Sequence, residues 1–294
     1  MNKSLTVILV IILSLLVVGL SGLLYFTISN PSMNIFKFSA SFGYSTKLID
    51  EKEIDEIKDL NINTNISDVK IEEKDIDYIK VEMYSDNEKS HSIIDGSKEV
   101  EISLIEKNKV FGLFNKTGNI KVYVPKDYNK VIKVNSNVGD IKILNLNNAS
   151  LVATSTVGDV KVQNINEANI IIKTGDIKIN NVNTLVAKGE TGDIKVEKVE
   201  TINATLTTGD IKIGSVTNSL DLSSKTGDIK VENANIKRNS KIDSGVGDVK
   251  IKSIRGCYIL GKTNVGDTKI NNFDRKSDIE LNINSRVGDI KVNY

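Results

Sequence analysis

A Gly–Asp pair followed two residues later by Lys recurs along most of the chain and could support chemistry at every copy. The pattern [TV]-G-D-[IVT]-K-[IV] occurs nine times. Carboxylates at such a spacing could bind calcium, pair with the lysines, or accept hydrogen bonds from nearby backbone N–H groups. The pairs are Gly139 and Asp140, Gly158 and Asp159, Gly175 and Asp176, Gly192 and Asp193, Gly209 and Asp210, Gly227 and Asp228, Gly247 and Asp248, Gly266 and Asp267, and Gly288 and Asp289.

Calcium binding is the weaker interpretation of this repeat. Calcium-binding β-rolls use G-G-x-G-x-D repeats, with paired glycines and more carbonyl ligands per turn. Here the glycine is single, and the lysine that follows lies on the same strand face as the aspartate. A lysine column would offset the repulsion between stacked carboxylates. We therefore predict a structural role, in which glycine forms a corner and aspartate bonds to the backbone, and no metal or cofactor.

Other reactive groups are few. The single histidine, His91, lies in E-K-S-H-S-I-I-D-G and is expected in a solvated loop, and the single cysteine, Cys257, is expected to be buried. Glycan-active enzymes with a β-helix fold need paired carboxylates or an Arg or Lys base in a groove that departs from the repeat, and the sequence has no such singular cluster. A threonine column at 174, 191, 208 and 226 could suggest an ice-binding face, but Val fills that position in most other copies. We predict no catalytic residues and no enzyme.

The charge balance argues against nucleic acid as a partner. The chain has 39 Lys and Arg against 38 Asp and Glu. Nucleic-acid binding needs a surplus of basic side chains, which displace counterions from the phosphates. One cysteine also excludes an internal disulfide framework.

The repeat predicts β-strands. Two and four residues after each glycine stands an aliphatic side chain (Thr at position 268), and a lysine lies between the two. This alternation is typical of a strand with one buried face. A further copy, T-G-N-I-K-V, contains Gly118, and the weaker I-S-D-V-K-I has Ser67 in place of the glycine. Spacings of about 17 to 22 residues indicate a solenoid.

We therefore predict an all-β chain with a single-stranded parallel β-solenoid, or β-helix, of about ten rungs at residues 117–294. An irregular β cap at 47–116 and a linker at 31–46 precede the solenoid. Within the cap, V-F-G-L-F at 110–114 is expected to pack as a cover, or to contact a membrane or partner. The last copy stops at Tyr294, so we expect an open strand edge there, guarded by Arg286, Asp289 and Lys291.

The first 30 residues predict a transmembrane anchor. Residues 5–28 carry no charge. As a helix they would span about 36 Å, enough for a bilayer core of about 30 Å. No small-residue cleavage pattern follows, so an uncleaved anchor is favoured over a signal peptide. We expect a single-pass protein of the cell membrane, with the N-terminus inside and the C-terminal domain extracytoplasmic.

These features together resemble the bacterial putative-adhesin family of β-strand-repeat domains, which includes LiaG-like membrane-anchored proteins. The segment I-K-V-Y-V-P-K-D-Y at 120–128, which leads to V-I-K-V-N-S-N-V-G-D at 131–140, resembles the start of that family's repeats. The resemblance implies a β-solenoid, an envelope location and an adhesive or envelope-stress role. It implies no catalytic residues and no assigned biochemical function.

The expected function is therefore that of a membrane-anchored, extracytoplasmic β-solenoid that binds, adheres or serves as an envelope scaffold without catalysis. Its partners would be the membrane and an envelope polymer or another envelope protein. Two alternatives stay open: an accessory protein of an envelope stress-sensing system, and a glycan-active enzyme.

Overall fold

The computed structural model describes residues 47–85, 90–105, 118–271 and 277–293. All of them belong to one compact unit, Thr46–Tyr294, which separates from Met1–Ser45. Within the described ranges no helix is long and apolar enough to span a bilayer. The predicted anchor, the 31–46 linker and the 110–114 segment lie outside these ranges and stay predictions.

Alternating aliphatic and charged residues form long parallel strands that coil into rungs. Each rung consists of one run of strand before a Gly–Asp corner and one run after it. The strands of this stack are β2 (Asp59–Lys74), β5 (Glu99–Ile105), β6 (Gly118–Pro125), β7 (Val131–Val138), β8 (Ile141–Leu144), β9 (Leu146–Val157), β10 (Val160–Thr174), β11 (Ile177–Thr191), β12 (Ile194–Thr208), β13 (Ile211–Thr226), β14 (Ile229–Asn235), β15 (Ser240–Val246), β16 (Val249–Arg255), β17 (Tyr258–Val265), β18 (Thr268–Ile270), β19 (Glu280–Val287) and β20 (Ile290–Val292).

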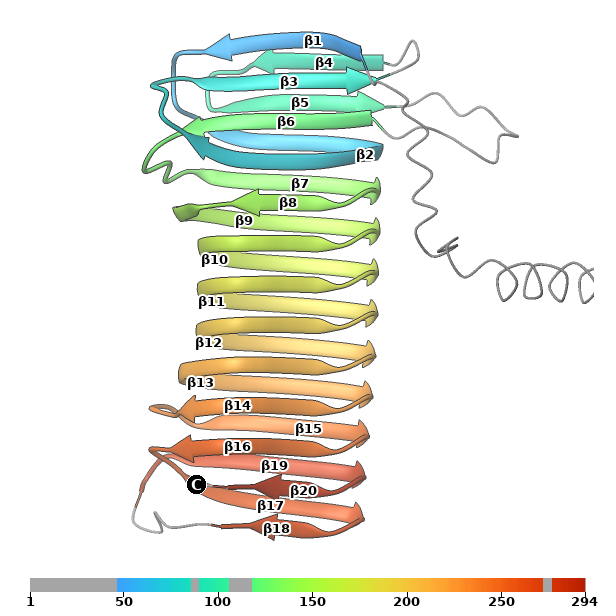
Figure 1. Ribbon diagram of the computed structural model, residues 1–294, viewed down its shortest axis with the longest axis vertical. Helices are drawn as coiled ribbons and strands as arrows, with labels where there is room; N and C mark the ends of the chain where they lie inside the picture. The colour runs from blue at the N-terminus through green and yellow to red at the C-terminus, as the bar shows by residue number, and fades with distance from the viewer. Residues whose placement is uncertain (1–46, 86–89, 106–117, 272–276, 294) are drawn as a thin grey trace, which may run out of the picture. The chain divides into compact units, whose positions relative to one another are not determined.

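Neighbouring rungs are aligned so that like residues stack. Ile177 lies beside Ile194 and Lys178 beside Lys195 where β11 pairs with β12. Ile194 is 1% exposed, while Lys195 is exposed. Because both runs of a rung turn their aliphatic side chains inward, the core is a continuous column that no rung could bury alone. The predicted all-β solenoid of stacked parallel strands is confirmed (Figure 1).

At the N-terminal end, the chain order and the stacking order differ. β2 comes from the segment that the sequence assigns to the cap, yet it forms a rung. One side of β2 pairs with β5 and β6, and the other side pairs with β7 and β8. Ser67 therefore lies between Gly118 and Gly139 in space, although Gly118 follows Ser67 by about fifty residues in the printed sequence.

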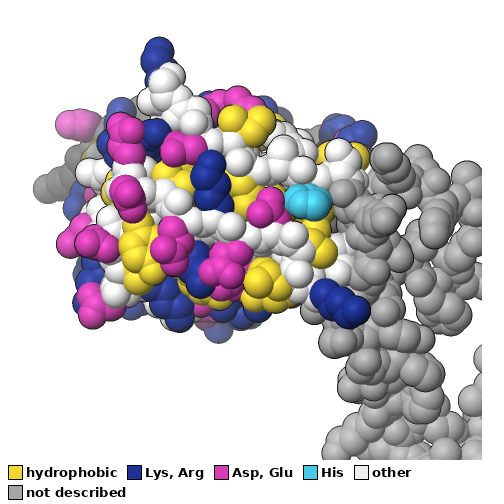
Figure 2. All heavy atoms as spheres, turned by 90° about the horizontal axis from the view of Figure 1, so that it is seen from above, with side chains coloured by type: hydrophobic (Ala, Val, Ile, Leu, Met, Phe, Trp, Pro, Cys, Tyr) yellow, Lys and Arg dark blue, Asp and Glu magenta, His cyan; other side chains and the backbone are white. Residues whose placement is uncertain are grey.

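Antiparallel strands cover this N-terminal end. β3 (Ile79–Ser85) pairs with β6, β1 (Lys47–Ile54) pairs with β3, and β4 (Ser90–Asp95) pairs with β5. Seen end-on, acidic and basic side chains are interspersed with small hydrophobic patches (Figure 2). Charged side chains, and the irregular register of β1 between Leu48 and Asp50, discourage the addition of further strands.

At the C-terminal end the structure corrects the expected open edge. The last repeat forms β19 and β20, which lie between earlier strands: β19 between β15 and β17, and β20 between β16 and β18 (Figure 1). Asp289 and Lys291 are therefore not at the end of the stack, and Arg286 on β19 is not either. The outermost described rung is β17–β18, because the C-terminal rung β19–β20 is inserted between β15–β16 and β17–β18.

The outermost rung has a reduced apolar core. Gly261 and Thr268 take the inward positions that Ile283 and Ile290 occupy one rung further in. The Ile270 side chain fills the space where a Gly261 side chain would stand. The core thus narrows at this end, which limits the apolar surface left facing solvent.

Candidate functional site

The Gly–Asp corners form one continuous column along the stack. Gly192 has φ +129°, a region that side chains disfavour, and a Cβ there would overlap the carbonyl oxygen of Gly175. Each corner therefore stacks closely on the one before it. In space the corner residues follow the order Gly118, Ser67, Gly139, Gly158, Gly175, Gly192, Gly209, Gly227, Gly247, Gly288 and Gly266.

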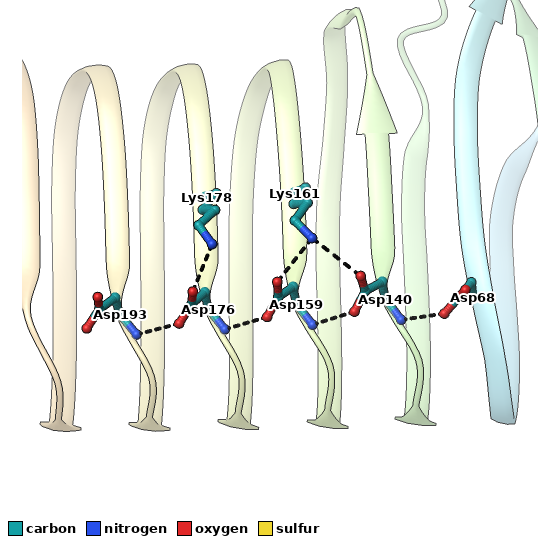
Figure 3. A network of polar contacts seen from close by, with 7 residues as sticks. All are labelled: Asp68, Asp140, Asp159, Lys161, Asp176, Lys178 and Asp193. Atoms are coloured by element: carbon teal, nitrogen blue, oxygen red, sulfur yellow. Dashed lines mark hydrogen bonds and ion pairs between the residues drawn. The ribbon is translucent and has the colours of Figure 1, made fainter. Parts of the chain in front are cut away.

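The corner aspartates form a hydrogen-bonded column, here called the aspartate ladder. The backbone N–H of Asp193 donates to Oδ1 of Asp176 at 2.9 Å, and the N–H of Asp210 donates to Oδ1 of Asp193 at 2.9 Å. Figure 3 shows part of this column. From one end to the other the ladder contains Asp68, Asp140, Asp159, Asp176, Asp193, Asp210, Asp228, Asp248, Asp289 and Asp267.

The need for an aspartate follows from the direction of the corner N–H groups. Gly192 N donates to Thr208 O, and Ile194 N donates to Asp210 O, both in the following rung. The intervening Asp193 N–H donates to the preceding rung, where the Asp176 carboxylate accepts it. The side chain thus supplies an acceptor for a backbone donor that the turn directs away from the regular ladder.

Lysines neutralise part of this column. Lys178 Nζ lies 2.8 Å from Asp176 Oδ2, and Lys161 Nζ lies 3.0 Å from Asp159 Oδ2. The hydrogen bond from Lys178, followed by that from the Asp193 N–H, holds the pKa of Asp176 below its ordinary value. Burial alone would raise the pKa of Asp159, but the hydrogen bonds that it accepts outweigh burial and lower it.

The aspartates are thus engaged with protein groups rather than grouped as a ligand set. In the part of the chain that the structure describes, no group of three or more His, Cys, Asp or Glu side chains could hold a metal ion. The calcium alternative gains no support from this arrangement, because every ladder carboxylate before the last, Asp267, already accepts a hydrogen bond from the next rung.

His91 and Cys257 lie away from the corners and from each other. His91 is on strand β4 rather than in the expected loop, and its Nε2 is 3.8 Å from Asp50 Oδ2. Strand β4 forms because S-H-S-I-I-D pairs with β5 along its whole length. Cys257 is 1% exposed, so the prediction of a buried thiol is confirmed.

A polar depression lies near the C-terminal end of the described stack. We call it the cationic hollow. Its volume is about 700 Å³, and it lies over β13, β15, β19 and β17. The lining includes the cations Lys225, Lys262 and Arg286 and one acidic side chain, Asp243.

Sequence reasoning missed this hollow. One signal was present, since Gly245 in S-G-V-G-D interrupts a position that carries a side chain in the other Gly–Asp copies. The neighbours of Gly245 could not be read from the sequence, because Arg286 comes from a repeat that is not next in chain order.

A model of the family described as Toastrack DUF4097 matches residues 57–293. The chain belongs to this family. The Toastrack match covers most of the described strands, so the predicted relationship to β-repeat domains of unassigned function is confirmed. Among curated proteins, none matches significantly.

Several solved structures are similar to this Toastrack chain. A "putative adhesin" from Bacteroides fragilis is 16% identical with TM-score 0.42, covering 85% of this chain and 98% of that one. A "putative cell adhesion protein" from Clostridium sporogenes is 15% identical with TM-score 0.26, covering 84% and 99%. A "putative lipid binding protein" from Parabacteroides distasonis is 14% identical with TM-score 0.39, covering 83% and 96%. Similarity at this level does not assign a function, so the function is inferred from the geometry of this chain itself.

Proposed function

We propose that this protein is a membrane-anchored, extracytoplasmic β-solenoid that acts by binding or by holding position, without catalysis. The observation that carries the proposal is the aspartate ladder. The repeated carboxylates are the residues most able to do chemistry, and they accept backbone hydrogen bonds from rung to rung. Groups committed in this way serve stability, and the solenoid is left to present its outer faces to partners.

The uncharged 5–28 segment supports the anchoring part of the proposal. Its length matches a bilayer core, and Lys3 is the only charged residue before Lys37. An anchor at this end would tether a binding unit to the envelope. The expected partners are an envelope polymer or another envelope protein.

Protease treatment of intact cells tests the location. With a tag after Tyr294, added protease should remove the tag from whole cells and leave a short membrane-bound fragment. A tag that stays protected in intact cells but is lost after lysis would refute the extracytoplasmic orientation. A mature N-terminus near residue 30 would refute the anchor.

Capture on envelope material tests the binding role. The full chain in detergent should retain polymer or protein from envelope fractions of cells that lack it. The matched control is Ile194→Asp, which places a charge at a core position that is 1% exposed and should unfold the stack. Equal retention by the two proteins would show that the folded solenoid is not the binding element.

A further inference from the structure

We infer that the cationic hollow binds an oxyanion group, phosphate or carboxylate, carried by a hydroxyl-rich polymer. This inference rests on the proposed binding function and gives it a location. The hollow is formed by the outward faces of β13, β15, β19 and β17 close to the Gly–Asp corners.

The first support is unbalanced charge. Within the described ranges, no ion pair joins Lys225, Lys262 or Arg286 to a carboxylate. The one acidic group of the lining, Asp243, is already engaged: Lys241 Nζ lies 2.5 Å from its Oδ2, and Asn284 Nδ2 donates to its Oδ1 at 3.1 Å. The hollow therefore offers three positive side chains and no free negative one.

Two other depressions on the stack lack this imbalance. A cavity of about 320 Å³ is lined by Asp248, Asp267 and Asp289 together with Lys250, Lys269 and Lys291. A smaller one of about 180 Å³ combines lysines with Glu197 and Glu232. A further cavity of about 320 Å³ has one cation, Arg255, and no carboxylate. The cationic hollow is larger than these three cavities and has three cations against one carboxylate, which favours an anionic ligand.

The second support is the shape of the site. The residue two positions before each corner glycine points outward, and along the stack this column reads Lys173, Glu190, Thr207, Lys225, Gly245, Arg286 and Asn264. Gly245 has no side chain, and it lies between Lys225 and Arg286. A Cβ at Gly245 would overlap the carbonyl oxygen of Lys225, so the two backbones pack closely here and no side chain separates the two cations.

The third support is the polarity of the remaining lining. Ser223, Asn264 and Asn284 contribute hydroxyl and amide groups rather than apolar surface. Such groups can donate to and accept from the hydroxyls of a sugar or polyol. Arginine and lysine both bind phosphate and carboxylate, and arginine does so through two parallel hydrogen bonds.

The insertion of the last repeat creates this site. Ser244 and Val246 of β15 pair with Ser285 and Val287 of β19, so Gly245 lies next to Arg286. In chain order, the next rung would have placed Asn264 there instead. The hollow therefore depends on the same rearrangement that moves β17–β18 to the end of the stack.

Binding of defined polymers tests the inference. The full chain in detergent is titrated by calorimetry with polyphosphate, with oligogalacturonate and with neutral dextran of similar length. We expect binding to at least one anionic probe and none to dextran. The double variant Lys225→Ser, Arg286→Ser should bind at least about tenfold more weakly, because two charge-assisted contacts are lost.

A matched variant separates this site from general charge. Lys173→Ser removes a lysine from the same outward column, several rungs away from the hollow, and should leave affinity unchanged. Equal weakening by both variants would overturn the inference, as would unchanged binding in the double variant. Failure of every anionic probe, with retention of envelope material intact, would overturn the hollow and leave the proposed function standing. Circular dichroism melts confirm that each variant is folded.

Discussion

At the scale of single residues, the Gly–Asp corner shows why the repeat keeps both residues together. Gly192 permits the close approach of Gly175, and that turn leaves the Asp193 N–H facing the preceding rung. The preceding aspartate then accepts this N–H, so the glycine creates the donor and the aspartate satisfies it. A buried donor without an acceptor costs about 1–3 kcal/mol, and the aspartate avoids a cost of this kind for the part-buried N–H of the next rung.

Removing one ladder carboxylate tests this account. Asp193→Ala leaves the Asp210 N–H without its 2.9 Å acceptor and should lower the free energy of unfolding by about 1–3 kcal/mol. Asp193→Asn keeps an acceptor oxygen at the same position and should cost clearly less. Chemical denaturation of both variants gives the comparison. If Ala and Asn cost the same, the ladder bond contributes little.

Acid should weaken the stack through the same carboxylates. Hydrogen bonds from Lys178 and Lys212, followed by those from backbone N–H groups, hold the pKa values of Asp176 and Asp210 below the ordinary 3.8. A pKa that is lower in the folded chain adds stability that is fully present above the unfolded value. That stability is lost as the pH falls through the folded value.

The pH dependence can be assigned with one variant. The double variant Lys178→Gln with Lys212→Gln should have a lower free energy of unfolding than the wild type at neutral pH. This difference should become smaller below about pH 4, because the carboxylates protonate there. Denaturant melts between about pH 3 and pH 7 measure it. A difference that stays constant across this range would show that the two lysines do not act through the aspartates.

At the scale of elements, the stack tolerates exchange of the order of its rungs. Most rungs share the Gly–Asp corner and the alternation of side chains, so β19–β20 can pair with β15–β16 on one side and with β17–β18 on the other. The same property lets β2 pair between β5–β6 and β7–β8. A repeat sequence thus specifies how rungs pair but not which rung lies next to which.

Cysteine pairs can distinguish the two orders. Asp243 lies beside Asn284 in the structure, whereas chain order would place it beside Lys262. Strands that pair directly are about 4.8 Å apart, within disulfide range, and strands one further away are about 9.6 Å apart, beyond it.

We expect the double variant Asp243→Cys with Asn284→Cys to form a disulfide on oxidation. The double variant Asp243→Cys with Lys262→Cys should not form one. Mass spectrometry of peptides after mild oxidation gives the readout. Cys257 is buried and leaves the engineered thiols to react with each other. A crosslink in the second pair alone would show that the rungs stack in chain order, contrary to the structure.

At the scale of the whole described unit, the two ends are closed by different means. Antiparallel strands cover the N-terminal end, and a reduced core with polar side chains finishes the C-terminal end. Lys269 lies on the outermost strand, β18, and Asp267 directly precedes this strand. Charge at a strand edge discourages pairing with another chain. These devices oppose end-to-end association.

We therefore expect the described unit to stay monomeric. Sedimentation of the chain over a wide concentration range should give one monomeric species. The double variant Thr268→Ile with Lys269→Ile should associate, because the two substitutions add apolar surface and remove a charge at the strand edge. Association of the wild type would instead identify β17–β18 as an interface.

The sequence by itself determined the local structure. The aliphatic residues on both sides of each lysine gave strands with one buried face, and Gly–Asp gave corners with a hydrogen-bonding role for aspartate. These features could be predicted because each depends on neighbours within a few residues: side-chain alternation, the backbone freedom of glycine and the reach of a short carboxylate. Repetition at a regular period then indicated a solenoid.

Only the tertiary structure decided the order of the rungs and everything that depends on it. The sequence placed Arg286, Asp289 and Lys291 at an open edge, whereas all three lie inside the stack. Rungs with the same pattern have nearly equal pairing energies, so chain order alone cannot choose among them. The choice depends on small differences that act only in three dimensions, such as Gly261 and Thr268, which suit an end better than the middle of a core. The cationic hollow follows from that choice, because it needs Arg286 beside Gly245.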